Sequence, residues 1–363
     1  MSRRLNLISN ILSLLITVGL VFLVVFISNE RFKGGAFYVI LSLVLSAIIS
    51  GFIITFLHEL GHLVFGRANG FKLISFTVWF LRWSRKKGKT VFDFTWFGEE
   101  AGYTEMVASS TGCVDKGFKR MTFGGLLFTL IPMLAGIVPF FIPNLPIYLF
   151  IFWAMFLPIG AYVFFGNALP MENYGVANDG EVLRSLRKNT DTSKVTLSLL
   201  KIQSELYNGK TPSEISDSYY FDVPQLREDD LNFVLLLNAR YYYYLDCGDY
   251  ENAKKVSDRA ITLLEYFPKS IIYAVKADAL FNACTFDFNE TVADDLTYEL
   301  EKYLNSVNSA TNLRIKLAYL KNVKKEQEIV EIFYKKAIKE AKKIPVEGLK
   351  KLEIKLIENL VNN

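Results

Sequence analysis

Residues 34–62 read GGAFYVILSLVLSAIISGFIITFLHELGH and carry the most informative pattern in the chain. The part that precedes HELGH contains no charged side chain, and its length is sufficient for a membrane-spanning helix of about 20 residues. A helix places the two histidines of HELGH on one face. His58 and His62 can then bind one zinc ion, while Glu59 holds a water molecule beside it. The stretch predicts zinc-dependent hydrolysis at membrane depth, where ionisable residues are costly and usually functional.

Three further stretches are long and free of charge. Together with residues 34–62, they predict membrane spans at 5–28, 36–66, 121–142 and 147–167. A turn at residues 143–146, PNLP, separates the last two spans. The first stretch is too long for a signal peptide and lacks a cleavage site, so we expect an uncleaved anchor. We therefore expect an integral protein of a bacterial cell membrane, with the lipid bilayer as its first partner.

Basic residues predict the orientation of these spans. Arg3 and Arg4 place the N-terminus in the cytoplasm by the positive-inside rule. The second span then returns to the cytoplasm, and a basic cluster at residues 82–89 follows it. The histidines are therefore expected near the cytoplasmic end of their helix. Two more spans return the chain to the cytoplasm, which places the C-terminal part there too.

Residues 71–108 are predicted to form a small β-region beside the membrane. Residues 71–80 and 91–97 are rich in aromatic and β-branched side chains, and the basic segment 85–89 lies between them. This pattern predicts a β-hairpin, with a third strand at residues 103–108. Aromatic side chains in such number are typical of a membrane interface. The hairpin is expected either to cap the cytoplasmic side or to bind an unwound substrate by strand addition.

The chain changes character near residue 181, so we expect two domains, 1–180 and 181–363. The first holds the predicted spans and the β-region, while the second is polar and has no further run of membrane length. The predicted fold class is mostly α. It combines a polytopic membrane helix bundle and a small membrane-associated sheet with a C-terminal cytosolic α-helical domain.

The second domain contains a weak repeat pattern. Gly248, Ala253 and Ala260 are spaced as in one tetratricopeptide-like pair of helices, and Pro268 stands where such a repeat ends. An irregular helical bundle is the competing interpretation. A repeat array offers a concave binding surface, on which a regulatory protein or a substrate could be held.

Cysteine content and net charge argue against two other classes of protein. The 3 cysteines form neither a disulfide framework nor a Cys-x-x-Cys metal pair. The formal net charge of +4 gives no electrostatic support for binding to nucleic acid.

The predicted zinc site needs a third protein ligand, with the fourth position left to water. The chain has only 2 histidines, so this ligand is expected to be a carboxylate. The candidates outside the helical domain are Asp93, Glu99, Glu100, Glu105, Asp115, Glu172 and Asp179. Asp179 follows the fourth span and reaches the depth of the histidines if that span packs beside the second. Glu172 is the rival, because it lies nearer the end of the span.

These features resemble the site-two protease family of intramembrane zinc metalloproteases. Residues 58–71, HELGHLVFGRANGF, resemble the family's first motif and the glycine-containing exit of its helix. Asn167, Pro170, Asp179 and Gly180 resemble the family's second motif, Asn-x-x-Pro followed by Asp-Gly.

Two weaker similarities support the same family. Residues 101–106 resemble its glycine-rich strand, and the pair Gly124-Gly125 resembles its glycine-containing core helix. The resemblance covers about residues 34–182. It implies that Asp179 is the third zinc ligand and that Asn167 positions the substrate or polarises its carbonyl.

Two features differ from the family's pattern. The family commonly has a short segment with two prolines between the asparagine and the aspartate, whereas Asn167 and Asp179 are 12 positions apart with one proline. Phe128 and Thr129 stand where the family often has an asparagine.

The motif and the resemblance predict an intramembrane zinc metalloprotease in which Glu59 is the general base. Expected substrates are single-span membrane proteins or peptide precursors. The main alternative is a catalytically impaired, protease-like scaffold that binds a regulator through its helical domain. Two others are a protease of soluble peptides at the cytoplasmic face, and a transporter or immunity protein with an incidental zinc site.

Overall fold

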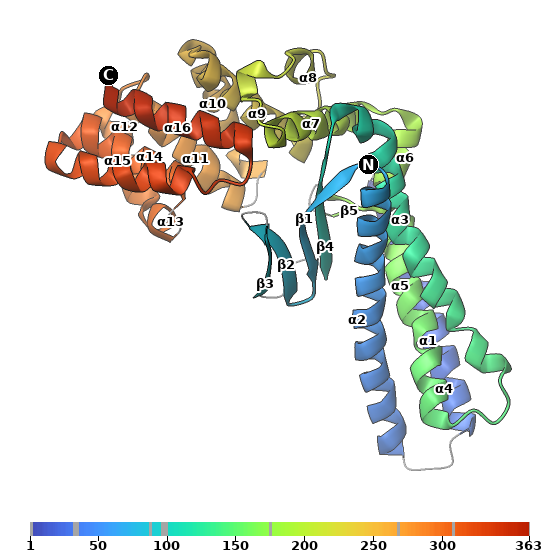
Figure 1. Cartoon of the computed structure of the whole chain (residues 1–363). Helices are drawn as coiled ribbons and strands as arrows, with labels where there is room; N and C mark the ends of the chain where they lie inside the picture. Colours follow the sequence, from blue (N-terminus) through green and yellow to red (C-terminus); the bar gives the residue numbers. More distant parts are fainter. Residues whose placement is uncertain are drawn as a thin grey trace. The chain divides into compact units, whose positions relative to one another are not determined.

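The computed structural model describes residues 3–31, 36–86, 89–95, 101–173, 176–266, 269–306 and 309–362 (Figure 1). The chain forms two compact units, Met1–Ser193 and Lys194–Asn363. The first unit contains the membrane-length helices and the sheet, and the second is helical. The domain boundary expected at residue 181 falls inside α6 (Asp179–Lys188), which belongs to the first unit.

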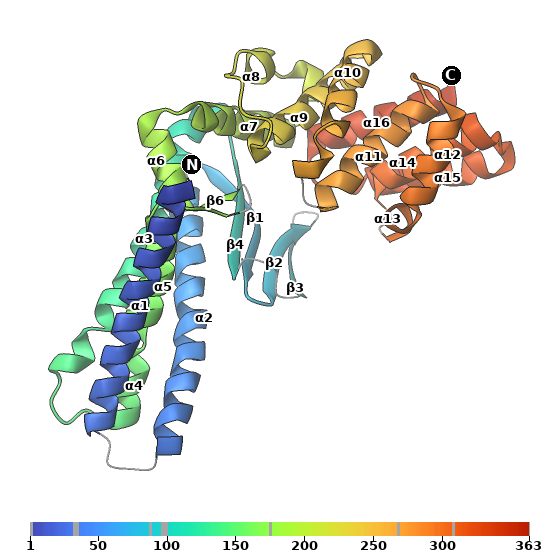
Figure 2. The ribbon, with the colours of Figure 1, turned by 180° about the vertical axis from the view of Figure 1, so that it is seen from behind.

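Four helical segments of the first unit are long and apolar enough to span a membrane, which confirms the predicted number of spans: Asn6–Arg31, Phe37–Ala68, Thr111–Phe141 and Ile147–Ala168. They comprise α1 (Arg3–Arg31), α2 (Ala36–Ala68), η1 (Thr111–Cys113), α3 (Val114–Ala135), η2 (Val138–Phe141), α4 (Ile147–Ala154) and α5 (Phe156–Ala168). The long helices lie side by side in both views of the ribbon (Figures 1 and 2).

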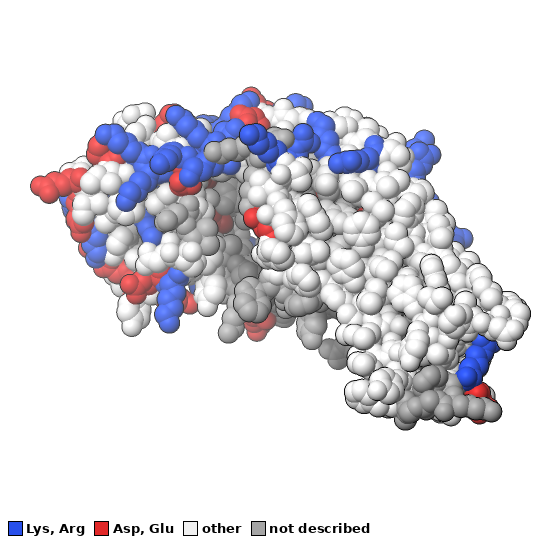
Figure 3. Space-filling view, turned by 60° about the horizontal axis from the view of Figure 1, so that its bottom comes forward, with Lys and Arg blue, Asp and Glu red and all other residues white. Residues whose placement is uncertain are grey.

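The outer surface of this helix bundle is apolar. Large side chains such as Phe22, Phe37 and Phe141 are strongly exposed, and the side of the bundle seen in Figure 3 is nearly free of charged residues between its ends. Water penalises such a surface, whereas lipid chains do not. The surface is therefore that of a bundle in contact with lipid.

Helices α2 and α3 cross at two glycines. A β-carbon at Gly61 would overlap the carbonyl oxygen of Gly124, and one at Gly124 would overlap the carbonyl oxygen of Gly61. Small residues allow this close approach of two helix backbones in a membrane. The crossing brings α3 next to the histidines of α2.

The β-region is a four-stranded antiparallel sheet of β1 (Phe71–Val78), β2 (Leu81–Lys86), β3 (Lys89–Phe94) and β4 (Gly102–Ala108), in the order β3-β2-β1-β4. The predicted third strand is confirmed as β4. The predicted pairing of residues 71–80 with 91–97 is wrong, because β2 lies between β1 and β3. Trp83 of β2 is opposite Phe76 of β1 on one side and Phe92 of β3 on the other. Trp96 and Phe97 lie outside the described residues.

The turn between β1 and β2 explains the error. Trp79 adopts a positive φ of 53°, which is unusual for a bulky residue and which no glycine, asparagine or aspartate announces. Its backbone N–H donates to the carbonyl of Ala101 at 2.8 Å. Its ring packs edge-on against Phe52 of α2, with centroids 5.5 Å apart. Tertiary contacts with the membrane helix therefore stabilise a turn that the local sequence does not indicate.

The second unit consists of helices: α7 (Asp191–Tyr207, which begins in the first unit), α8 (Ser218–Phe221), α9 (Leu231–Cys247), α10 (Tyr250–Ile261), α11 (Lys269–Cys284), α12 (Glu290–Glu299), α13 (Glu301–Ser306), α14 (Ala310–Ala318), α15 (Gln327–Ala341) and α16 (Glu347–Asn362). Gly248, with φ 76°, ends α9, and Ala253 and Ala260 of α10 are buried. This is the predicted helix pair. A tetratricopeptide array remains a prediction, and Pro268 lies outside the described residues.

Candidate metal centre

Helix α2 presents the two histidines one turn apart, as their spacing predicts. The Nε2 atoms of His58 and His62 are 3.1 Å apart. His58 and Glu59 are 6% and 5% exposed, and all three residues lie within the membrane-length segment Phe37–Ala68. Polar side chains buried at this depth need partners.

Asp179, the first residue of α6, completes a three-residue cluster with the histidines. Its Oδ2 lies 3.4 Å from Nε2 of His58 and 3.4 Å from Nε2 of His62. Oδ2 is buried and, within the described part of the chain, has no hydrogen-bond partner. Three electron-donating atoms thus face one another, all within 4.8 Å.

The cluster fits a zinc ion. Zinc binds histidine nitrogen and carboxylate oxygen at about 2.0–2.2 Å, so ligand atoms on a tetrahedron lie about 3.3 Å apart. The observed separations are 3.1, 3.4 and 3.4 Å. Two histidines and one carboxylate also leave a fourth position for water, as in catalytic zinc sites.

Contacts to α3 orient both imidazole rings. Nδ1 of His62 lies 3.0 Å from the carbonyl oxygen of Met121, which can only accept. Nδ1 of His58 lies 2.9 Å from Oγ1 of Thr129, and the Thr129 hydroxyl donates to the carbonyl of Gly125 at 2.9 Å. Thr129 therefore accepts from His58. Both contacts favour the tautomer that is protonated on Nδ1, in which the Nε2 lone pairs are directed at the cluster.

Gly125 is required at this position because α3 passes directly behind the rings. A β-carbon there would overlap the ring of His62, and would lie 3.0 Å from Cε1 of His58. The glycine pair identified in the sequence therefore has two roles. Gly124 allows the helices to cross, and Gly125 leaves room for the imidazoles.

Strand β4 orients the carboxylate of Glu59. The hydroxyl of Thr104 donates to Oε2 of Glu59 at 2.6 Å. The backbone of Gly102 passes so close that a β-carbon there would lie 2.6 Å from Oε1. The general-base candidate is thus held between its own helix and the terminal strand of the sheet.

The long segment between Asn167 and Asp179 folds into a compact connection. Two short strands, β5 (Glu172–Asn173) and β6 (Val176–Ala177), pair with each other and take up the extra length. The twelve-position spacing is therefore compatible with bringing Asp179 to the histidines.

Asn178 fastens the two ends of this connection. Its amide donates to the carbonyls of Gly166 and Leu169, both at 2.7 Å. Its Oδ1 accepts from the backbone N–H groups of Met171 and Glu181, both at 3.0 Å. One side chain thus caps α6 and joins it to the end of α5. This fixes the position of the neighbouring Asp179.

The rival ligand Glu172 is tied to a different helix. The side chain of Asn6 on α1 donates to the Glu172 carbonyl at 2.8 Å and accepts from the Glu172 N–H at 3.1 Å. Glu172 does not belong to the described cluster around the histidines. Helix α1 thereby holds the hairpin that precedes Asp179.

The other candidate carboxylates lie elsewhere in the described structure. Glu105 on β4 accepts from the Ser75 hydroxyl at 3.0 Å. Asp93 is on β3, Asp115 is in the first turn of α3, and neither joins the histidine cluster. Glu99 and Glu100 lie outside the described residues.

Asn167 makes a local contact in the structure. Its amide donates to the carbonyl of Val163 at 2.9 Å, one turn earlier in α5. The role in substrate positioning, which the resemblance implies for Asn167, remains a prediction.

Sequence reasoning missed several residues that support the cluster: Asn6, Thr104, Thr129 and Asn178. Only Thr129 left a usable signal. It follows Gly125 by one helical turn, so a predicted α3 places both on the same face.

The fold and the cluster together define a class, that of membrane proteins with a buried histidine–carboxylate metal centre beside a glutamate. Residues 46–347 match Peptidase family M50. The chain belongs to this family, the site-two protease family, whose members are integral membrane zinc metalloproteases. No curated protein and no solved structure matches the chain.

The match confirms the family that the sequence motifs indicate. Those motifs cover about residues 34–182, whereas the matched region continues through most of the helical unit. Helix α1 lies outside the matched region.

Proposed function

We propose that this protein is an intramembrane zinc endopeptidase, with zinc held by His58, His62 and Asp179. One observation carries the proposal. The buried Oδ2 of Asp179 has no hydrogen-bond partner in the described structure, and it faces two imidazole nitrogens whose lone pairs are directed at it. Such an arrangement of donor atoms is suited to a metal cation.

The chemistry follows from this site. Bound zinc would supply a Lewis acid that acidifies a water molecule and polarises a peptide carbonyl. Glu59 takes the proton from the water as it attacks the carbonyl, and then delivers that proton to the leaving amine. The Thr104 hydrogen bond keeps the Glu59 carboxylate in one orientation during both transfers.

The proposed substrates are single-span membrane proteins or peptide precursors. A helical substrate must unwind locally, because its carbonyls are occupied by backbone hydrogen bonds. Strand β4 ends the sheet, and its Thr104 contacts Glu59. A substrate segment that extends the sheet at β4 would pass next to the general base. The competing role for the sheet is a cap over the cytoplasmic side.

Glu59→Gln tests the proposal. The variant should keep its zinc, because Glu59 is not a ligand, and should lose proteolysis. Metal analysis of the purified full-length protein measures the first effect. N-terminal profiling of membrane fractions from cells that express either protein measures the second. Glu105→Gln is the matched control, since Glu105 lies on β4 away from the cluster. Undiminished cleavage by Glu59→Gln would falsify the mechanism.

The scaffold alternative makes the opposite prediction. A catalytically impaired protein has no need for rings locked in one tautomer, for an oriented general base or for a fastened third ligand. If Glu59→Gln and the unmodified protein give identical membrane proteomes, the scaffold hypothesis takes precedence.

The proposed orientation places the N-terminus and the helical unit in the cytoplasm of a bacterial cell. Cys247 in the helical unit is exposed. A membrane-impermeant maleimide should therefore label Cys247 in inverted vesicles and not in intact cells. Labelling in intact cells would reverse the orientation.

A further inference from the structure

Helix α3 carries a basic patch just before its charge-free part. The patch consists of Lys116, Lys119 and Arg120, which are all exposed. Their spacings of three and four positions place them on one face of the helix. Asp115 is the acidic residue of α3. Three basic residues against one acidic residue leave a formal charge of +2 on the first turns of the helix.

Below the basic patch, the same side of α3 is apolar and exposed. Phe123 follows Arg120 by about one helical turn, and Ile131 continues along this side. Their side chains are 50% and 58% exposed. The charge-free run begins at Met121, inside the membrane-length segment Thr111–Phe141. This segment of 31 residues is longer than the roughly 20 needed to cross the hydrocarbon, so its basic first turns extend into the head-group layer.

The end of α2 holds Arg120 in position. Nη1 of Arg120 donates to Oδ1 of Asn69 at 2.8 Å, and the Asn69 amide donates to the carbonyl of Phe65 on α2 at 2.7 Å. The two helices lie close together here, because a β-carbon at Gly117 would lie 3.0 Å from the Asn69 carbonyl oxygen. A guanidinium has five N–H donors. Arg120 is therefore ordered by one contact and keeps donors for an anion.

The carboxylates of the first unit leave the basic patch without a salt bridge. Among its described residues, salt bridges join Asp179 to the two histidines and Arg184 to Glu181. No residue of the basic patch takes part in them. The patch thus combines unneutralised positive charge and an ordered guanidinium with an apolar surface directly beneath it.

We propose that the basic patch binds the head group of an anionic phospholipid. The phosphate accepts hydrogen bonds from Arg120 and Lys116, while an acyl chain lies along Phe123 and Ile131. Basic residues next to a membrane helix attract anionic lipids, and the low polarity beside them favours a lipid over a free anion. The inference goes beyond the proposed function, because it involves neither zinc nor peptide hydrolysis.

Native mass spectrometry of the full-length protein in a non-ionic detergent tests the inference. The probes are dioleoyl-phosphatidylglycerol, dioleoyl-phosphatidylcholine with the same chains and no net charge, and glycerophosphoglycerol, which has the anionic head group and no chains. A basic residue near an anionic lipid contributes about fivefold in affinity. For a local charge of +2, we expect the first phosphatidylglycerol to bind about 25-fold more tightly than phosphatidylcholine. Glycerophosphoglycerol should not bind.

Substitutions in the basic patch separate a defined site from general charge attraction. Lys116→Gln/Arg120→Gln should remove the preference for phosphatidylglycerol. Asn69→Ala keeps every charge and should lower the preference a few-fold, because Arg120 loses its anchor. An unchanged unfolding temperature without added lipid checks that each variant is folded.

The matched control is Lys335→Gln/Lys339→Gln, which removes two exposed lysines with the same spacing from α15 of the helical unit. It should retain the full preference. Phe123→Ala should weaken binding of both phospholipids and leave their ratio unchanged. Equal affinity for the two phospholipids, or a preference that survives Lys116→Gln/Arg120→Gln, overturns the inference. An unchanged preference in Asn69→Ala also overturns it, since charge alone would then attract the lipid. Tight binding of glycerophosphoglycerol would show a site for free phosphate esters instead.

Discussion

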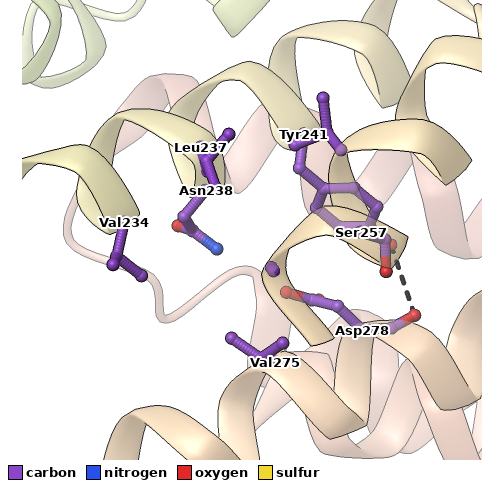
Figure 4. Close-up of a pocket in the computed structure, with 9 residues that line it drawn as sticks. Val234, Leu237, Asn238, Tyr241, Ser257, Val275 and Asp278 are labelled. Carbon is purple, nitrogen blue, oxygen red and sulfur yellow. Dashed lines mark hydrogen bonds between the residues drawn. The ribbon is translucent and has the colours of Figure 1, made fainter. Parts of the chain in front are cut away.

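Asp179 and Asp278 are largely buried carboxylates, one in each unit, and they differ in what surrounds them. Asp179 faces two imidazole nitrogens, each 3.4 Å from its Oδ2, and this buried oxygen has no hydrogen-bond partner in the described structure. The carboxyl of Asp278 borders a small hollow with a largely apolar wall (Figure 4) and accepts a hydrogen bond from the Tyr242 hydroxyl. A buried acid that faces two imidazole nitrogens is suited to a metal ion, whereas a buried acid beside an apolar wall holds its own proton more tightly.

The largest expected effect comes from Asp179→Ala. Removal of a direct ligand should lower zinc affinity by more than the roughly 100-fold that loss of an outer contact costs. Metal analysis of the purified protein should show zinc near background. Glu172→Ala is the control and should retain zinc. Loss of zinc in Glu172→Ala and its retention in Asp179→Ala would make Glu172 the third ligand, and Asp179 would then no longer be an example of a metal-binding carboxylate.

Gly125→Ala should also displace zinc, because the new methyl group overlaps the ring of His62. We expect a lower zinc content together with a lower thermal unfolding temperature, since a packed helix pair must separate. The control is Gly166→Ala on α5, where an added β-carbon has no neighbour within 4 Å. Full zinc binding by Gly125→Ala would show that the rings lie elsewhere in the working protein.

Thr129→Val should reduce zinc affinity by about 10–100-fold, the range for residues that orient a metal-binding histidine. Valine has nearly the same shape but cannot accept a hydrogen bond from His58. Thr129→Ser restores the hydroxyl and should recover most of the affinity. Competition with a chelator measures the three proteins. Similar affinities for all three would mean that the tautomer of His58 is not controlled by Thr129.

Asn6→Ala should have a smaller effect on the metal centre. The substitution removes two hydrogen bonds to Glu172 and loosens the hairpin before Asp179. We expect faster release of zinc to a chelator, while Asn178 still fastens α6. Asn10→Ala is the control, because the contact that the described structure gives the exposed Asn10 amide lies within its own helix, to the carbonyl of Asn6. Unchanged release would confine α1 to a role as an anchor.

The smallest expected effect concerns stability and pH at Asp278. Folding raises the pKa of this carboxyl from 3.8 to about 7, so the folded state holds the proton more tightly than the unfolded state. The contribution of Asp278 to stability is therefore complete below the lower value and is lost as the pH rises through the higher one. The Asp278→Asn variant has no carboxyl at this position, so its stability does not fall in this way as the pH rises. Thermal unfolding should show that the stability of the variant increases relative to that of the unmodified protein as the pH increases, with no change in zinc content. A constant difference at all pH values would contradict the assignment.

The parts of the structure that the sequence predicted well depend on local patterns. Charge-free runs indicate the spans, and the spacing of His58 and His62 brings them together on one helix. The parts that were missed depend on distant contacts. Thr129 is 71 positions from His58, and Asn6 is 166 positions from Glu172. Strand β2 was missed for a related reason, because the Trp79 turn before it depends on Phe52 of α2. The motif resemblance supplied Asp179, which spacing alone left in competition with Glu172.

The crossing of α2 and α3 also determines how the protein can respond to its bilayer. Each of Gly61 and Gly124 has its carbonyl where the other would place a side chain, so a slide of one helix along the other would bring a bulkier residue into the contact. Membranes of different thickness should therefore change the tilt of the whole bundle or the thickness of the surrounding lipid. The depth of the histidines relative to Thr129 would stay constant, and the metal centre would move with the bundle as a rigid body.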